Sequence, residues 1–196
     1  MLWVSAAFAA AFLTAAITLA SQGTGQAGTI VALRLTARLS LLLFWPAYAG
    51  GVLCSLHLPL LSGLGRRRRE IGLAFASAHS VHVMLILWLF HVAVRQPVST
   101  KTIIVDGIGI GWVYVLAAFS FDSLRRRLGP MALRILFNMG LEYIALVFLS
   151  DFLISPLKQG TAFSAAYLPF TVALVAAAAL RWTLAGSDLV ARTARI

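Results

Sequence analysis

The segment RRRREIGLAFASAHSVHVMLILWLFHVAV, residues 66–94, joins four arginines to an apolar run that holds three histidines. About 20 consecutive apolar residues suffice for a helix that crosses a hydrocarbon layer of ~30 Å, so the segment predicts a transmembrane helix over 71–94. Five further apolar runs of comparable length lie near 3–21, 39–62, 102–121, 131–154 and 163–185. We therefore expect an all-α protein, a single polytopic domain (1–196) of six transmembrane helices in a bundle.

The composition supports a membrane protein. Hydrophobic residues make up 61% of the chain and charged residues only 11%, with a mean hydropathy of +0.92. A soluble domain carries about 25% charged residues. The first run has no basic residues before it and is longer than the apolar part of a signal peptide, so we interpret it as a helix. Cys54 is the one cysteine, which excludes an intramolecular disulfide.

Basic residues cluster between the apolar runs. A net charge of +10 would suit a nucleic-acid partner, but this clustering is how membrane proteins fix their orientation, so we expect membrane lipid and no nucleic acid. In the six-helix arrangement, eleven of the sixteen Lys and Arg residues share the side of Arg66–Arg69. The other five are Arg34, Arg38, Arg95, Lys101 and Lys158. The richer side predicts a cytoplasmic face, with both termini cytoplasmic, in a bacterial inner membrane.

Ionisable groups inside membrane helices are costly, so each is a functional candidate. His79 and His82 are three residues apart and share one helix face, while His91 lies about 13 Å further along the axis. Neutral imidazole is the usual axial ligand of b-type haem in a helical bundle. Interhelical hydrogen bonding is the alternative, and the residues alone leave both open. We expect His57 to be an interface residue.

The segment from Arg66 to His82 also resembles a known family. A basic loop, then Gly72-Leu73, then a histidine ten residues after Gly72 is similar to the third-helix signature of the ferric-reductase-like transmembrane family. That family includes the haem-binding membrane subunit of the bacterial methionine-sulfoxide reductase system. The run 133–143, LRILFNMGLEY, is similar to the family's fifth helix. The resemblance spans most of the chain and implies six helices, cytoplasmic ends and haem b.

The chain departs from the family on the fifth helix. The family carries two haem-ligating histidines there, 13 residues apart, and this chain has Asn138 and Asp151 at that spacing. Neither residue is a common haem ligand, so a bis-histidine site between the third and fifth helices is not expected. Three alternatives stay open: one haem with a single histidine, His82 or else His79; a haem held by two histidines of the third helix or by His57; and no haem.

The acidic residues inside the runs suggest partners for the histidines. Residue counts from the cytoplasmic starts of the third and fifth runs lead us to expect Asn138 near His79 or His82, and Asp151 against His91. A neutral hydrogen-bond network, a proton or ion path and a remodelled cofactor pocket are the alternatives for this group, which also includes Asp106 and Glu142. The glycines at 107, 109 and 111 are expected to allow close helix packing.

The resemblance implies an electron-transfer function, as an oxidoreductase subunit that receives electrons from a redox partner protein or quinone. Two alternatives remain. One is a haem-free relative that serves as a membrane scaffold or assembly subunit. The other is a small proton-coupled transporter that uses Asp106, Glu142 and Asp151.

Overall fold

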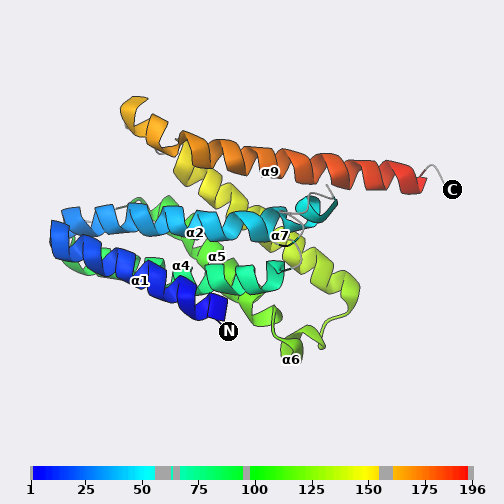
Figure 1. The fold of residues 1–196 in the computed structure, drawn as a ribbon, viewed down its shortest axis with the longest axis horizontal. Coiled ribbons are helices and arrows are strands. Elements are labelled where there is room, and N and C mark those ends of the chain that lie inside the picture. The colour runs from blue at the N-terminus through cyan, green and yellow to red at the C-terminus, as the bar shows by residue number, and fades with distance from the viewer. Residues whose placement is uncertain (1, 56–62, 64–66, 95–97, 155–160, 194–196) are drawn as a thin grey trace.

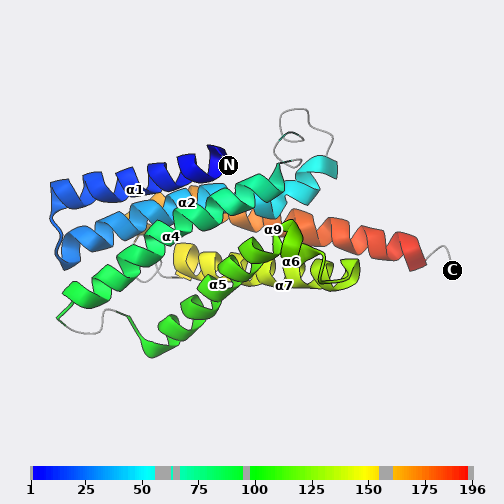
Figure 2. The same ribbon diagram turned by 90° about the horizontal axis from the view of Figure 1, so that it is seen from below.

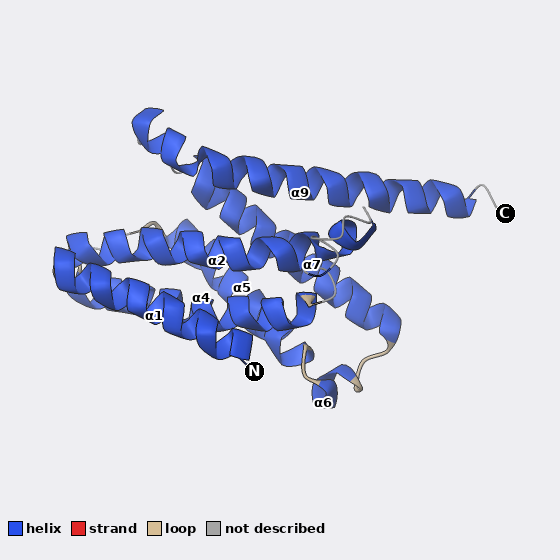
Figure 3. Cartoon of the chain, in the orientation of Figure 1, coloured by secondary structure: helices blue, strands red, loops and turns tan. Residues whose placement is uncertain are grey.

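A computed structural model describes residues 2–55, 63, 67–94, 98–154 and 161–193. Side chains of 51–55, 161–164 and 184–193 are not described. The elements in this part of the chain are all helical (Figures 1 and 3): α1 (Leu2–Gln22), α2 (Gln26–Ser55), α4 (Arg68–Val92), α5 (Thr100–Phe119), α6 (Asp122–Arg125), α7 (Pro130–Leu149), the π-helix η1 (Ser150–Ile154) and α9 (Thr161–Thr193).

Six of these helices are long and apolar enough to cross a membrane: Leu2–Gln22, Gln26–Gly50, Arg68–Val92, Thr100–Phe119, Pro130–Ile154 and Ala165–Thr183. The predicted all-α bundle of six transmembrane helices is confirmed. Local sequence explains several helix ends. Ser99 accepts a hydrogen bond from the Thr102 amide at the start of α5, and Pro130 occupies the first turn of α7, where a missing N–H costs nothing. Gly23 adopts a φ of 86° in the turn before α2.

Two cores hold the helices together. In the first, Ala7, Ala11 and Ala15 recur every four residues on α1, so that their small side chains let the backbone approach α2 and α4 closely. The second core is aromatic, with Phe44 of α2, Phe75 of α4 and Phe148 of α7 in mutual ring contact. This aromatic core lies in the middle of the bundle and separates the two hollows described below.

The second helix begins earlier than predicted. The sequence indicated 39–62, but α2 starts at Gln26, so Arg34 and Arg38 lie inside a membrane-crossing helix and not in a loop. The interior of the bundle accommodates the charge of Arg38, because its guanidinium lies 4.7 Å from the ring centroid of Tyr167 on α9. The prediction that these two arginines precede the second helix was wrong.

Both chain ends lie toward the same end of the bundle, as Figures 1 and 2 show. That end also carries α6 and the start of α4, with their arginines. The helix α7 runs obliquely across the others and begins beyond the start of α4, toward the end that carries α6 (Figures 1 and 2). Because of this offset, residues at equal distances from the starts of α4 and α7 do not lie at the same level in the bundle.

Candidate functional site

Two histidines face a small groove in the middle of the bundle. The rings of His79 and His82 stack with centroids 5.3 Å apart and an interplanar angle of 22°. Hydroxyl groups of α2 orient them, with Thr36 Oγ1 2.9 Å from His82 Nδ1 and Ser40 Oγ 3.4 Å from His79 Nδ1. Two helices thus fix the positions of both imidazoles.

The hydrogen bonds of Thr36 bear on the tautomer of His82. The Thr36 hydroxyl has one proton to donate and lies 2.9 Å from Ala32 O and 2.9 Å from His82 Nδ1. When that proton goes to the carbonyl, His82 Nδ1 is the donor to Thr36 Oγ1, which leaves the lone pair on Nε2. In that tautomer His82 presents a nitrogen that can accept a proton.

Two carboxylates share the same groove. Asp106 of α5 and Asp151 of η1 line it together with both histidines, within a space of about 60 Å³. The remaining wall is largely apolar, with Phe75, Val113, Ile144 and Phe148 among its residues. Four ionisable side chains from α4, α5 and η1 thus line one groove in the membrane-crossing part of the bundle, with Asp151 itself exposed.

Asp151 does not lie against His91, so the prediction made from residue counts along the two helices is wrong. No direct hydrogen bond or ion pair joins Asp151 to His91 within the described residues; Asp151 shares the groove with His79 and His82, while the exposed His91 contacts the ring of Trp88. Two features explain the difference. The start of α7 is displaced relative to that of α4, so equal residue counts do not give equal depths. In addition, α5 packs against both α4 and α7.

Asn138 also lies elsewhere than predicted. It lines a second, larger hollow and is not among the residues around His79 and His82. His57 lies outside the described residues.

Glu142 does not pair with a histidine but links three helices. It accepts hydrogen bonds from Arg181 Nε of α9 at 3.0 Å and from the Tyr48 hydroxyl of α2 at 2.8 Å. Arg181 also donates to the Tyr48 carbonyl oxygen at 2.9 Å, and its guanidinium lies 4.5 Å from the Tyr48 ring centroid. Neither Tyr48 nor Arg181 was predicted as a partner of Glu142. The position of Arg181 directly after an alanine-rich apolar run could have indicated a partner inside the membrane.

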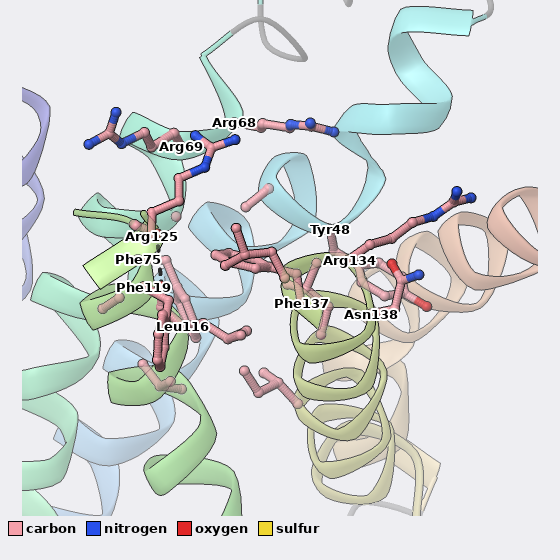
Figure 4. Close-up of a pocket in the computed structure, with 18 of the residues that line it drawn as sticks. Tyr48, Arg68, Arg69, Phe75, Leu116, Phe119, Arg125, Arg134, Phe137 and Asn138 are labelled. Atoms are coloured by element: carbon pink, nitrogen blue, oxygen red, sulfur yellow. Dashed lines mark hydrogen bonds between the residues drawn. The ribbon is translucent and has the colours of Figure 1, made fainter. Parts of the chain in front are cut away.

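The second hollow is a cavity of about 1050 Å³ at the end that carries α6, here called the basic cavity. Figure 4 shows it between α4 and α5 on one side and α7 on the other, with Arg68, Arg69 and Arg125 near its mouth. Its deeper wall is apolar, as Phe75 and Leu116 illustrate. Phe75, Val113 and Ile144 line both the basic cavity and the histidine groove. The two hollows therefore adjoin across one layer of side chains.

The residues around the histidines do not fit a haem. Sites for small molecules and cofactors measure about 300–1,000 Å³, and the groove at His79 and His82 measures about 60 Å³. Both imidazoles project from one helix, so they cannot bind an iron from opposite faces. The basic cavity is large enough, but none of the described residues that line it is a histidine, cysteine or methionine. His91 lines neither hollow.

Comparisons of the chain with models of protein families, with curated proteins and with solved structures find no significant match. The arrangement of the site therefore carries the functional argument.

Proposed function

We propose that this protein is a proton-coupled membrane transporter built on a ferric-reductase-like scaffold. The supporting observation is that His79, His82, Asp106 and Asp151 line one groove, separated from the basic cavity by a single layer of side chains. Ionisable groups inside a bundle are typical of proton relays and substrate paths. The more basic end faces the cytoplasm of a bacterial inner membrane in this proposal.

The groove has the chemistry to hold and release a proton. Two carboxylates in an apolar environment repel each other, and a proton placed on one of them relieves that repulsion. His82 Nε2 is a neighbouring acceptor in the same groove. The basic cavity on the other side of Phe75 then holds the solute, and alternate opening of the two hollows would couple proton and solute movement.

Proteoliposomes test this function. Wild-type protein is reconstituted with a pH-sensitive dye inside, and internal pH is followed after a gradient of octanesulfonate or a membrane potential is imposed. We expect protein-dependent proton movement that Asp151→Asn and Asp106→Asn abolish. The matched control is Glu70→Gln, because Glu70 is an exposed carboxylate that lines neither the groove nor the basic cavity. Proton movement no faster than in protein-free vesicles under both conditions would contradict the proposal.

Haem-dependent electron transfer, which the resemblance to the ferric-reductase-like family implies, is the alternative to exclude, because the residues around His79 and His82 do not fit a haem. An absorption spectrum of protein purified from haem-replete cells separates the candidates. A Soret band lost on His82→Ala supports electron transfer. A colourless preparation that moves protons supports the transporter, and one that moves none favours the scaffold or assembly alternative.

A further inference from the structure

The basic cavity and its mouth bring arginines from four elements together. Arg68 and Arg69 of α4 and Arg125 at α6 lie at the mouth, and Arg126, Arg134 of α7 and Arg181 of α9 also line the cavity. In Figure 4 Arg68 and Arg125 extend over the same side of the opening. Guanidinium groups recognise carboxylate, phosphate and sulfonate oxygens through paired hydrogen bonds.

Acidic residues neutralise only part of this charge. Asp122 pairs with Arg69 at 3.2 Å, and Glu142 pairs with Arg181 at 3.0 Å. Within the described part of the chain, no acidic side chain forms an ion pair with Arg68, Arg125, Arg126 or Arg134. The mouth therefore has an excess of positive charge that an anionic group would balance.

The deeper part of the cavity has the opposite character. Phe44, Phe75, Val113, Leu116 and Ile144 line it, and none of these side chains carries a hydrogen-bonding group. A volume of about 1050 Å³ is at the upper end of the range of small-molecule sites, about 300–1,000 Å³. An inorganic anion alone would leave this apolar space unfilled, so the cavity suits a larger ligand with an apolar body.

We propose that the basic cavity binds an amphipathic anion, with its acidic head group among the arginines and its apolar body against Phe75 and Leu116. A lipid with a phosphate head group and a free organic anion with an alkyl chain share this chemistry. The role of such a ligand as cargo rests on the transporter proposed above. Binding does not, because it requires no proton movement, and the two are measured separately.

Calorimetry on the purified full-length protein in neutral detergent tests binding, with octanesulfonate as the probe and octanol as the uncharged comparison. We expect saturable octanesulfonate binding and at least tenfold weaker octanol binding. Because each guanidinium would donate a hydrogen bond to a charged group, Arg68→Gln and Arg125→Gln should each weaken octanesulfonate binding by about tenfold or more. Arg127→Gln is the matched control, since Arg127 belongs to the same arginine cluster but does not line the cavity.

A second pair of variants tests the apolar part. Gly72 lines the cavity, and a Cβ there would meet only Ala47 Cβ, at 4.0 Å, so Gly72→Leu can enter the space without a backbone clash. Gly111 has no atom within 4 Å of its added Cβ and does not line the cavity, which makes Gly111→Leu its control. Octanesulfonate binding should fall only in Gly72→Leu.

Native mass spectrometry distinguishes the two sources of the ligand. Protein equilibrated with phosphatidylglycerol and phosphatidylcholine should retain phosphatidylglycerol selectively, and lose it on Arg68→Gln, if the ligand is a membrane lipid. Octanesulfonate binding without such retention identifies a free organic anion, and either result supports the proposed class. Equal binding of octanol and octanesulfonate, or equal loss in Arg125→Gln and Arg127→Gln, would overturn it. Binding without any proton movement would leave the binding site intact and reject only the transporter.

Discussion

The ion pair of Glu142 and Arg181 joins α7 to α9, and its contribution to the free energy of unfolding can be measured by mutation. Glu142 accepts two strong hydrogen bonds, from Arg181 Nε at 3.0 Å and from the Tyr48 hydroxyl at 2.8 Å. The side chains of Arg181 and Glu142 are only 18% and 30% exposed. Replacement of Glu142 with glutamine removes the charge but keeps the size, so the variant reports on the ion pair and not on a cavity.

The magnitude follows from two reference values. A hydrogen bond to a charged group contributes about 1.5–3 kcal/mol in soluble proteins. Polar contacts between membrane helices average about 0.6 kcal/mol, with a maximum near 1.7 kcal/mol. Because this contact is charged and shielded, we expect it at the top of the membrane range, with a coupling free energy of about 1.5 kcal/mol. That value corresponds to about a tenfold change in the unfolding equilibrium.

A double-mutant cycle of Glu142→Gln and Arg181→Gln isolates this coupling, with unfolding of the purified protein followed in mixed micelles. The control is the ion pair of Arg69 and Asp122, with 3.2 Å between Arg69 Nη1 and Asp122 Oδ1. The side chains of this pair are 45% and 64% exposed. Exposed pairs contribute about 0–1 kcal/mol, so the cycle of Arg69→Gln and Asp122→Asn should give the smaller coupling. A coupling for Glu142 and Arg181 no larger than that of the exposed pair would refute the reasoning.

Three further predictions concern packing, orientation and haem. Gly140→Ala should destabilise the protein by about 1–3 kcal/mol, because an added Cβ would lie 2.8 Å from Trp112 Cε3 and 2.9 Å from Leu116 Cδ1; Gly111→Ala, which meets nothing within 4 Å, should have little effect in the same unfolding assay. Reporter fusions after Arg127 should read cytoplasmic and fusions after Gln22 periplasmic, and the opposite pattern would reverse the orientation. Asn138→His would supply an imidazole to the basic cavity; a gain in Soret absorbance would support a haem pocket, and no gain would support the haem-free interpretation.

The sequence predicts the number of helices well because each helix corresponds to one long, uninterrupted apolar run in the local sequence. Each run is long enough to span a bilayer, and an isolated backbone polar group in lipid costs so much that a helix is the one available conformation for such a run. The fifth run illustrates this, since it was predicted at 131–154 and its span is Pro130–Ile154. The length of the apolar run alone determines these boundaries.

The start of α2 shows where that signal fails. Arg34 and Arg38 interrupt the hydropathy pattern, and the sequence alone does not show that a second helix will shield them. In the structure the Arg38 guanidinium lies over Tyr167, which is 129 positions further along the chain. Long arginine side chains can also extend their charge away from the backbone. Such long-range compensation is a property of the packed bundle and not of the local sequence.

The sequence singled out the ionisable residues inside the apolar runs as candidates, and four of them, His79, His82, Asp106 and Asp151, line one groove. Their pairing was not predictable from depth, because helix tilt and the offset of α7 change which residues lie at one level. The basic cavity was missed, because its arginines belong to four elements that only the fold brings together.

Asn138 and Asp151, which lie on the same membrane span, have distinct surroundings. Asn138 lines the basic cavity, and Asp151 lines the histidine groove. In the proposed transporter the two residues therefore serve different hollows. At 151 a carboxylate supplies a group that can exchange protons in the groove of His82, and at 138 an amide supplies a neutral hydrogen-bonding group to the basic cavity. The bundle thus places a groove with ionisable groups next to a cavity lined by arginines, which is the arrangement that the proposed proton-coupled binding of an anion requires.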